Sequence, residues 1–131
     1  MLELKRLEAT RIAASSSALG DLVLAANHLL MRTAKDEALV IPAADLKLSD
    51  PHALIVAEGG FAGIWLSRGE ALDFLERNCE WELPKERPAF AQGMVAGIPT
   101  KIWLEPERVL LLVPVPYAHD FGEQLSEGAR S

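Results

Sequence analysis

The sequence predicts an α+β domain in which helices alternate with pairs of strands. Three observations support this fold class: a strand-like run at 61–66, an amphipathic pattern at 68–79, and two β-rich runs at 98–104 and 109–115. A closing helix is expected at 116–128. The order strand, helix, strand, strand, helix makes up most of a split βαβ unit. We therefore expect a mainly antiparallel sheet covered by two to three helices.

The helix at 68–79 has a recognisable start signal. Ser67 places a hydroxyl at the N-cap position, and Glu70 places a carboxylate three residues later, so each side chain can accept a backbone N–H of the first turn. Apolar residues then recur at helical spacing with charged residues between them, which indicates one buried face and one solvated face.

A hairpin and a final helix are expected after it. The polar linker Glu105–Arg108 joins the two β-rich runs and contains Pro106, whose fixed dihedral favours a turn. Pro116 then stands at a first helical position, and Tyr117 begins an apolar series at four-residue steps that continues with Phe121 and Leu125.

The N-terminal half, residues 1–52, fits the same plan. Residues 2–9 alternate between apolar and charged side chains, which is typical of an edge strand. The serines at 15–17 precede a helical apolar stripe that extends to Thr33, with Asp21 in the first turn, where the helix dipole favours negative charge. This pattern predicts a long helix.

Two short strands and a turn are expected next. The apolar runs 38–41 and 53–56 have the length of strands, with a loop at 43–51 between them. Gly59 and Gly60 predict a tight turn into the strand that begins at Phe61. We expect a single domain over residues 1–131, with a helix-containing N-terminal part at 1–52 and a second part at 53–131.

Length, charge and hydropathy exclude several classes of protein. The 131 residues carry 13 basic and 19 acidic side chains, and the net charge of −6 argues against nucleic acid as a ligand. A disulfide framework is excluded by a single cysteine. No apolar run reaches the roughly 18 to 20 residues that cross a bilayer, so we expect no membrane insertion and a cytoplasmic protein.

Candidate chemistry is sparse, and no catalytic or metal-ligating residue is assigned. Cys79 has glutamates close by at positions 76, 80 and 82, which would disfavour a thiolate, so we interpret it as structural. Glu80 and Glu82 flank Trp81, and alternation places both carboxylates in solvent and the indole inward. His119 and Asp120 are helix neighbours and cannot face each other.

The histidines and tryptophans are the remaining candidates for a functional site. His28, His52 and His119 are expected in a helix, a loop and a helix, without the spacing of a metal site. Trp65 and Trp103 are expected in two strands that lie near each other in one sheet, where they would form either a core or sheet-face pair or part of a partner interface. The chain is 50% hydrophobic, which favours self-association or a subunit role.

Four short segments carry a resemblance to a known family: Trp65–Ala71, Leu75–Leu83, Phe90–Gly93 and Val109–Ala118. Together they resemble the small gamma subunit of heterotetrameric sarcosine oxidases, within the wider family of the glycine-cleavage T-protein, a tetrahydrofolate-binding aminomethyltransferase. The match spans Ala53 to Leu125. The resemblance implies ferredoxin-like split βαβ units as in the T-protein family, and partner subunits that carry flavin and tetrahydrofolate.

The resemblance implies a chain without chemistry of its own. No residue here matches the catalytic aspartate of the T-protein, so no catalytic or folate-binding residue is transferred. We therefore expect a small accessory subunit that supports oxidative demethylation of an N-methyl amino acid by larger oxidase-type subunits. The alternatives are a free-standing homo-oligomer that binds folate or another small acid, and an aminomethyltransferase-type enzyme.

Overall fold

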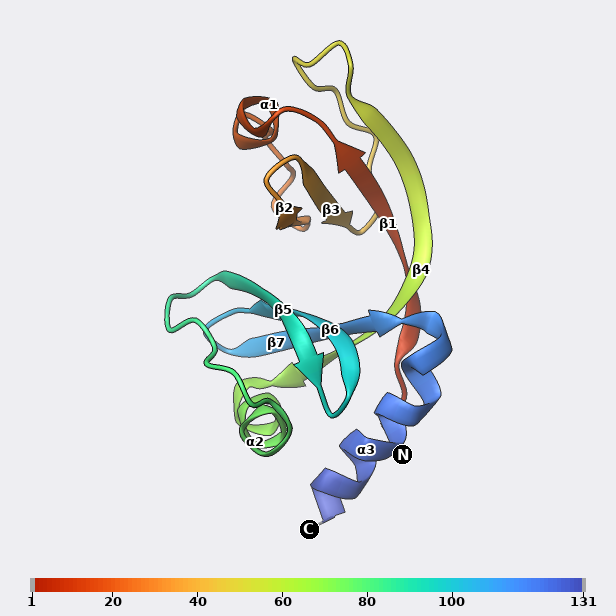
Figure 1. Ribbon diagram of the computed structural model, residues 1–131, viewed down its shortest axis with the longest axis vertical. Helices are drawn as coiled ribbons and strands as arrows, with labels where there is room; N and C mark the ends of the chain where they lie inside the picture. The colour runs from red at the N-terminus through yellow and green to blue at the C-terminus, as the bar shows by residue number, and fades with distance from the viewer. Residues whose placement is uncertain (1, 131) are drawn as a thin grey trace. The chain divides into compact units, whose positions relative to one another are not determined.

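The computed structural model describes residues 2–130 and shows an α+β protein with three α-helices and a mainly antiparallel sheet (Figure 1). The elements, in chain order, are β1 (Lys5–Ala13), α1 (Ser16–Gly20), β2 (Leu29–Ala34), β3 (Glu37–Ile41), β4 (Leu54–Ser67), α2 (Arg68–Asn78), β5 (Ala89–Val95), β6 (Ile98–Leu104), β7 (Arg108–Pro114), the 3₁₀ turn η1 (Val115–Tyr117) and α3 (Ala118–Arg130). The expected fold class is confirmed at this level.

Seven strands follow the order β2-β3-β1-β4-β7-β6-β5. The ladders β4–β7, β7–β6 and β6–β5 are all antiparallel, so β4 and β5 also run in opposite directions. A βαβ unit joins parallel strands, whereas α2 joins these two antiparallel ones. The ferredoxin-like arrangement is therefore not confirmed.

The backbone divides into two compact units, which we describe separately. Unit 1 contains residues 1–6 and 60–131, and unit 2 contains residues 7–59. Unit 1 thus includes the C-terminal part of β4 with β5, β6, β7, α2 and α3. Unit 2 includes most of β1, the N-terminal part of β4, and α1, β2 and β3.

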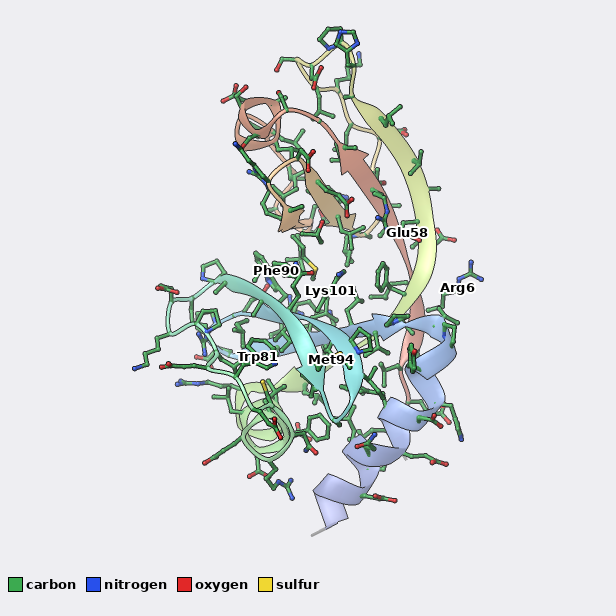
Figure 2. All side chains as sticks on the ribbon, viewed as in Figure 1. Arg6, Glu58, Trp81, Phe90, Met94 and Lys101 are labelled. Carbon is green, nitrogen blue, oxygen red and sulfur yellow. The ribbon has the colours of Figure 1, made fainter. Side chains whose placement is uncertain are left out.

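Alternation along the strands gives the unit 1 sheet two different faces. Ile102 and Leu111 pair across β6 and β7 and belong to the core that packs on α2 and α3. Phe90, Met94 and Lys101 occupy the alternate positions of β5 and β6, so their side chains lie on the opposite face (Figure 2).

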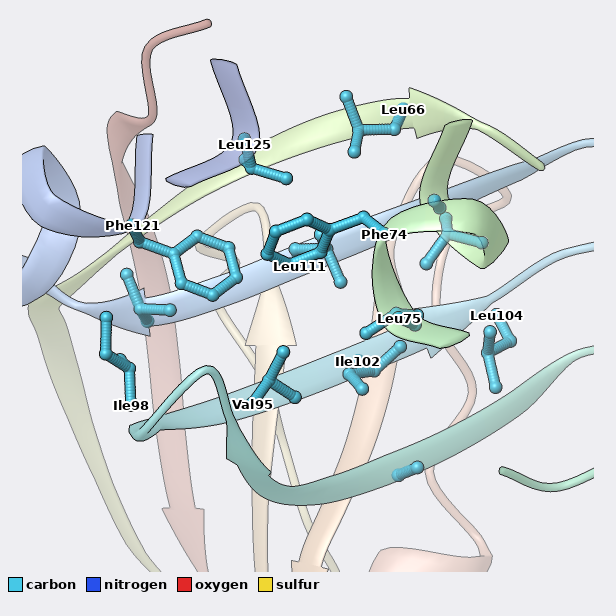
Figure 3. Close-up of a cluster of buried hydrophobic side chains, with 14 residues drawn as sticks. Leu66, Phe74, Leu75, Val95, Ile98, Ile102, Leu104, Leu111, Phe121 and Leu125 are labelled. Carbon is cyan, nitrogen blue, oxygen red and sulfur yellow. The ribbon is translucent and has the colours of Figure 1, made fainter. Parts of the chain in front are cut away.

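The core of unit 1 lies between this sheet and the two helices (Figure 3). Phe74 of α2 and Phe121 of α3 meet edge to face, with ring centroids 5.6 Å apart. Leu75 and Leu125 extend the same helix faces, and both are buried. Burying side chains of this size contributes about 1.5–3 kcal/mol each, so this layer provides much of the stability of unit 1.

Unit 2 has a smaller core on β1, β3 and α1. Ile12 and Val40 come from the two strands, which pair antiparallel with Thr10 opposite Val40, and Leu19 comes from the short helix. All three apolar side chains are fully buried. The loop 43–53 adds partly buried apolar side chains to the same cluster.

Several local predictions are confirmed. Ser67 caps α2 by accepting the backbone N–H of Glu70, and its own hydroxyl donates to the Glu70 carboxylate at 2.8 Å. β6 and β7 form the expected hairpin, with Leu104 opposite Val109. The closing helix is present, although its first turn around Pro116 is 3₁₀ and α3 begins at Ala118.

The prediction of one long helix from the serines at 15–17 to Thr33 is wrong. Ser15 does cap a helix, by accepting the backbone N–H of Ala18, but α1 ends at Gly20 and Asp21 is its C-cap. A carboxylate there faces the negative end of the helix dipole, and glycine is a poor helix former. Residues 21–28 after it form coil and turns, and only the end of the apolar stripe, from Leu29 on, belongs to β2, which pairs with β3.

Three further expectations need correction. The runs at 53–56 and 61–66 form one strand, β4, so Gly59 and Gly60 lie inside it and make no tight turn. The N-terminal strand is present but continues to Ala13 and lies between β3 and β4, so it is not an edge strand. The sequence pattern does not predict strand β5, because Gln92 and Gly93 interrupt its apolar run.

Candidate functional site

A row of large apolar side chains crosses the unit 1 sheet on the face away from the helices. Trp65 of β4 and Trp103 of β6 both lie opposite Leu110 of β7, one on each side, and Phe90 of β5 lies opposite Trp103. The expectation that the two tryptophans share a sheet is confirmed. Leu110 separates the two, so they do not form a direct cross-strand pair.

Arg108 joins the exposed end of this row. Its guanidinium carbon lies 3.7 Å from the centre of the Trp65 ring, which is a stacked cation–π contact. Its Nε donates to Glu105 at 2.8 Å, and the Trp103 indole N–H donates to the other oxygen of the same carboxylate at 2.9 Å. Glu105 thereby fixes Arg108 and Trp103 together. We call Trp65, Trp103, Glu105 and Arg108 the hairpin cluster.

The Glu105 carboxylate is held in its charged form. Partial burial favours the neutral acid, but the hydrogen bonds from Arg108 and Trp103 and the charge of Arg108 outweigh it and lower the pKa of Glu105 below 4.5. Trp65 retains 37% of its accessible surface and the Arg108 side chain 54%. The cluster therefore presents an ordered indole and guanidinium to solvent.

A second aromatic feature lies after α2. The Trp81 indole N–H donates to the carbonyl of Met94 at 2.9 Å, and the half-buried thiol of Cys79 donates to the carbonyl of Trp81 at 3.4 Å. Glu80 and Glu82 are exposed, as alternation predicted. Cys79 packs on the unit 1 core, so its contacts fit the structural interpretation.

The three histidines lie apart in the chain. His28 is in a coil, so the helix expected for it is wrong, and its buried Nδ1 has no hydrogen-bond partner among the residues that the structure describes. His52 is in the expected loop, where its backbone N–H donates to Asp50. His119 pairs with Glu123 at 3.0 Å across one helical turn, and so does not engage Asp120. Within residues 2–130, no three His, Cys, Asp or Glu side chains gather as a metal site would require.

Unit 2 exposes apolar side chains at the start of β4. Leu54 is 66% exposed, Ile55 40% and Val56 51%. Such residues on a strand expose both faces, because successive side chains alternate. Val23, in the coil after α1, is 89% exposed.

The unit 1 sheet also carries a shallow pocket of about 360 Å³. Its walls include Phe61, Met94, Pro99 and Pro114, which are apolar. Lys101 lies in it, with its ammonium 5.5 Å from the Phe61 ring centre and hydrogen-bonded to the side-chain oxygen of Gln92.

Two residues of the hairpin cluster were missed at the sequence level. The sequence pattern by itself predicts only a polar turn at Glu105 and Arg108. Their signal is the three-residue spacing of opposite charges across Pro106, two positions after Trp103, which a turn can close into an ion pair.

No helix in the described chain is long and apolar enough to cross a membrane. No protein-family model matches the chain, and no curated protein matches it.

Proposed function

We propose that this chain is a small accessory subunit of an amine-oxidising complex, resembling the gamma subunit of heterotetrameric sarcosine oxidase. In this role it binds larger subunits, which would carry flavin and tetrahydrofolate and oxidise an N-methyl amino acid. The chain itself contributes a docking surface.

The observation that carries the proposal is the exposed pair Trp65–Arg108. Tryptophan and arginine are the residue types that most often dominate binding energy at protein interfaces. Arg108 is already fixed by Glu105 and stacked on Trp65, so little side-chain entropy is lost when a partner covers it. A preorganised pair of this kind suits a stable subunit contact.

The location of the resemblance supports the identity of the partner. The four segments that resemble the gamma subunit all fall inside unit 1, which has its own core. They include the capped start of α2 at Ser67, the contact of Trp81 with β5, and the passage from β7 into α3. The resembling residues are therefore those that build this unit.

Affinity purification of the tagged chain from its native cells tests the proposal. We expect a larger subunit to co-elute, identified by mass spectrometry, with a flavin absorption spectrum in the eluate. Trp65→Ala and Arg108→Ala should each weaken binding of the flavin-bearing partner at least about tenfold, the effect of losing about 1.4 kcal/mol of binding energy, and so reduce the co-eluting flavin. Tyr117→Ala is the matched control, because Tyr117 is a similarly exposed aromatic residue of unit 1.

Two results would contradict the proposal. A colourless eluate that contains this chain alone would exclude a flavin-bearing partner. Equal flavin recovery from the Trp65 and Arg108 variants and the control would show that the partner binds elsewhere.

A free-standing folate-type binding module is the second candidate, and the pocket around Lys101 favours it. One cation among apolar walls suits a small acid with a planar body, which could contact the Phe61 ring. A bound pterin would appear in the near-ultraviolet spectrum of the purified protein and should be lost in Lys101→Met. A spectrum without pterin, and no binding of added folate, would remove this candidate.

A further inference from the structure

We propose that the start of β4 pairs with the same strand of a second copy of this chain. The two strands run antiparallel about a twofold axis at Ile55 and form a symmetric dimer. This inference goes beyond the accessory-subunit role, because it concerns unit 2 and needs no other protein.

The first argument is the position of the segment. β4 follows β1 in the strand order, and its ladder to β7 covers Phe61–Ser67 only. Within unit 2, β4 is therefore the strand at one edge, with β1 beside it (Figure 1). Backbone groups on the outer side of an edge strand are a template for a further strand.

The second argument is the composition of this edge. Proteins usually protect such edges with a charge, a proline or a bulge. Leu54–Ala57 has neither charge nor proline, although 24% of the chain is charged, and three of its four residues are large exposed apolar side chains. Water contact at these positions is unfavourable, and pairing would remove it on both faces of the strand.

The third argument identifies a second copy as the occupant. Antiparallel pairing centred on Ile55 places Leu54 opposite Val56 of the second copy, and Val56 opposite its Leu54. Both side chains lie on one face of their strand, so the two copies build a continuous apolar strip there. The segment is thus complementary to itself, as a twofold interface requires.

Charge at the ends of the segment agrees with this register. Glu58 of one copy would lie beyond the paired segment, beside the turn at 51–52 of the other copy, which carries His52, and this contact occurs twice. Glu58 is also neutralised within its own chain, because Arg11 Nε donates to its carboxylate at 2.9 Å. Two chains with net charge −6 can therefore meet here without like charges in contact.

Light scattering coupled to size exclusion, over a series of protein concentrations, tests the dimer. We expect the purified chain to approach twice its mass of 14.3 kDa as concentration rises. Leu54→Lys and Val56→Glu should each return the mass to that of the monomer, because each places a charge opposite an apolar residue. Val23→Lys, at an even more exposed apolar residue that is not part of β4, should leave the dimer intact.

Mixing the two variants tests the register. In a heterodimer of Leu54→Lys with Val56→Glu, the introduced charges lie opposite each other, and opposite charges in a cross-strand pair are favourable. The mixture should therefore recover the dimer mass that neither variant shows alone. A thermal transition of each variant equal to that of the wild type, measured at concentrations where the wild type is monomeric, would confirm that the variant monomers remain folded.

A wild-type chain that stays monomeric at every concentration would overturn the proposal. So would a dimer that survives both β4 variants, since the contact would then lie elsewhere. Neither result affects the proposal of a flavin-bearing partner, because the affinity purification tests the Trp65–Arg108 surface of unit 1.

Discussion

The indole of Trp81 lies directly over Gly93 of β5. A Cβ added at Gly93 would come within 2.7 Å of the indole ring, closer than real Cβ contacts. The indole is fixed there by its hydrogen bond to Met94, the next residue of the strand. Only glycine at position 93 leaves room for Trp81, so the two residues explain why this segment packs on β5.

Gly93→Ala should therefore destabilise the protein. The methyl group would force the indole off the strand, and overpacking of this kind costs about 1–3 kcal/mol. Chemical denaturation measures the loss, with Gly69→Ala as the control, because a Cβ at Gly69 meets no atom within 4 Å. In a Trp81→Ala background the same Gly93 change should cost much less, and an equal cost in both backgrounds would disprove the steric explanation.

The turn between β5 and β6 offers a stabilising change. Ala96 has a φ of 52° and Gly97 a φ of 78°, and Ala96 pays a steric cost that glycine and asparagine largely avoid. Ala96→Asn gives the Asn-Gly pair favoured in two-residue hairpins, so we expect a gain of about 0.5–1 kcal/mol in unfolding free energy. Gly97→Ala should lose about 1 kcal/mol. A neutral or negative effect of Ala96→Asn would contradict this account of the turn.

The C-terminal half was largely predictable from sequence because its signals are local. The Ser67–Glu70 cap, the Pro106 turn and the stripe through Phe121 each act within a few residues. The N-terminal half was not, because the apolar spacing after Ser15 fits a helix as well as a strand. Pairing with β3 makes the end of this segment a strand, β2, and a local sequence pattern does not show such pairing.

The contacts of the hairpin cluster also could not be predicted from local sequence patterns. Trp65 and Trp103 are 38 positions apart, and the sequence predicts that they lie close together only because each falls in a strand expected in the same sheet. Their common neighbour Leu110, and the exposed stacking of Arg108 on Trp65, depend on the antiparallel register of three strands. A shift of one of these strands by one residue would have moved its tryptophan to the other face of the sheet.

Cys79→Ser tests the structural role of the cysteine. The thiol is half-buried and donates to the Trp81 carbonyl, which a hydroxyl can also do, so we expect a loss of about 1 kcal/mol from the more polar side chain. For a chain of this length that corresponds to a decrease in Tm of roughly 3–5 °C. Loss of partner binding or of an activity at unchanged Tm would instead indicate a functional cysteine.

The pKa of Glu105 predicts how stability changes in acid. Its folded-state pKa is lowered by the Arg108 and Trp103 hydrogen bonds despite partial burial, so it contributes stability at pH values above its ordinary pKa of 4.5. That contribution is lost as pH falls from 4.5 through the lower folded-state pKa, where the carboxylate becomes protonated in both states. Stability should therefore decrease across this window.

Glu105→Gln isolates this contribution, because glutamine keeps the shape of the side chain but removes its charge. We expect the variant to lose about 1 kcal/mol near neutral pH, from the weakened bonds to Arg108 and Trp103. The difference from wild type should shrink as pH falls below 4.5, since protonation removes the same charge from the native side chain. Asp50→Asn is the comparison: its pKa is also lowered, by backbone N–H groups of His52 and Ser15, but its exposure to solvent should make the change smaller. A difference that stays constant with pH would mean that the Glu105 charge does not hold the hairpin cluster together.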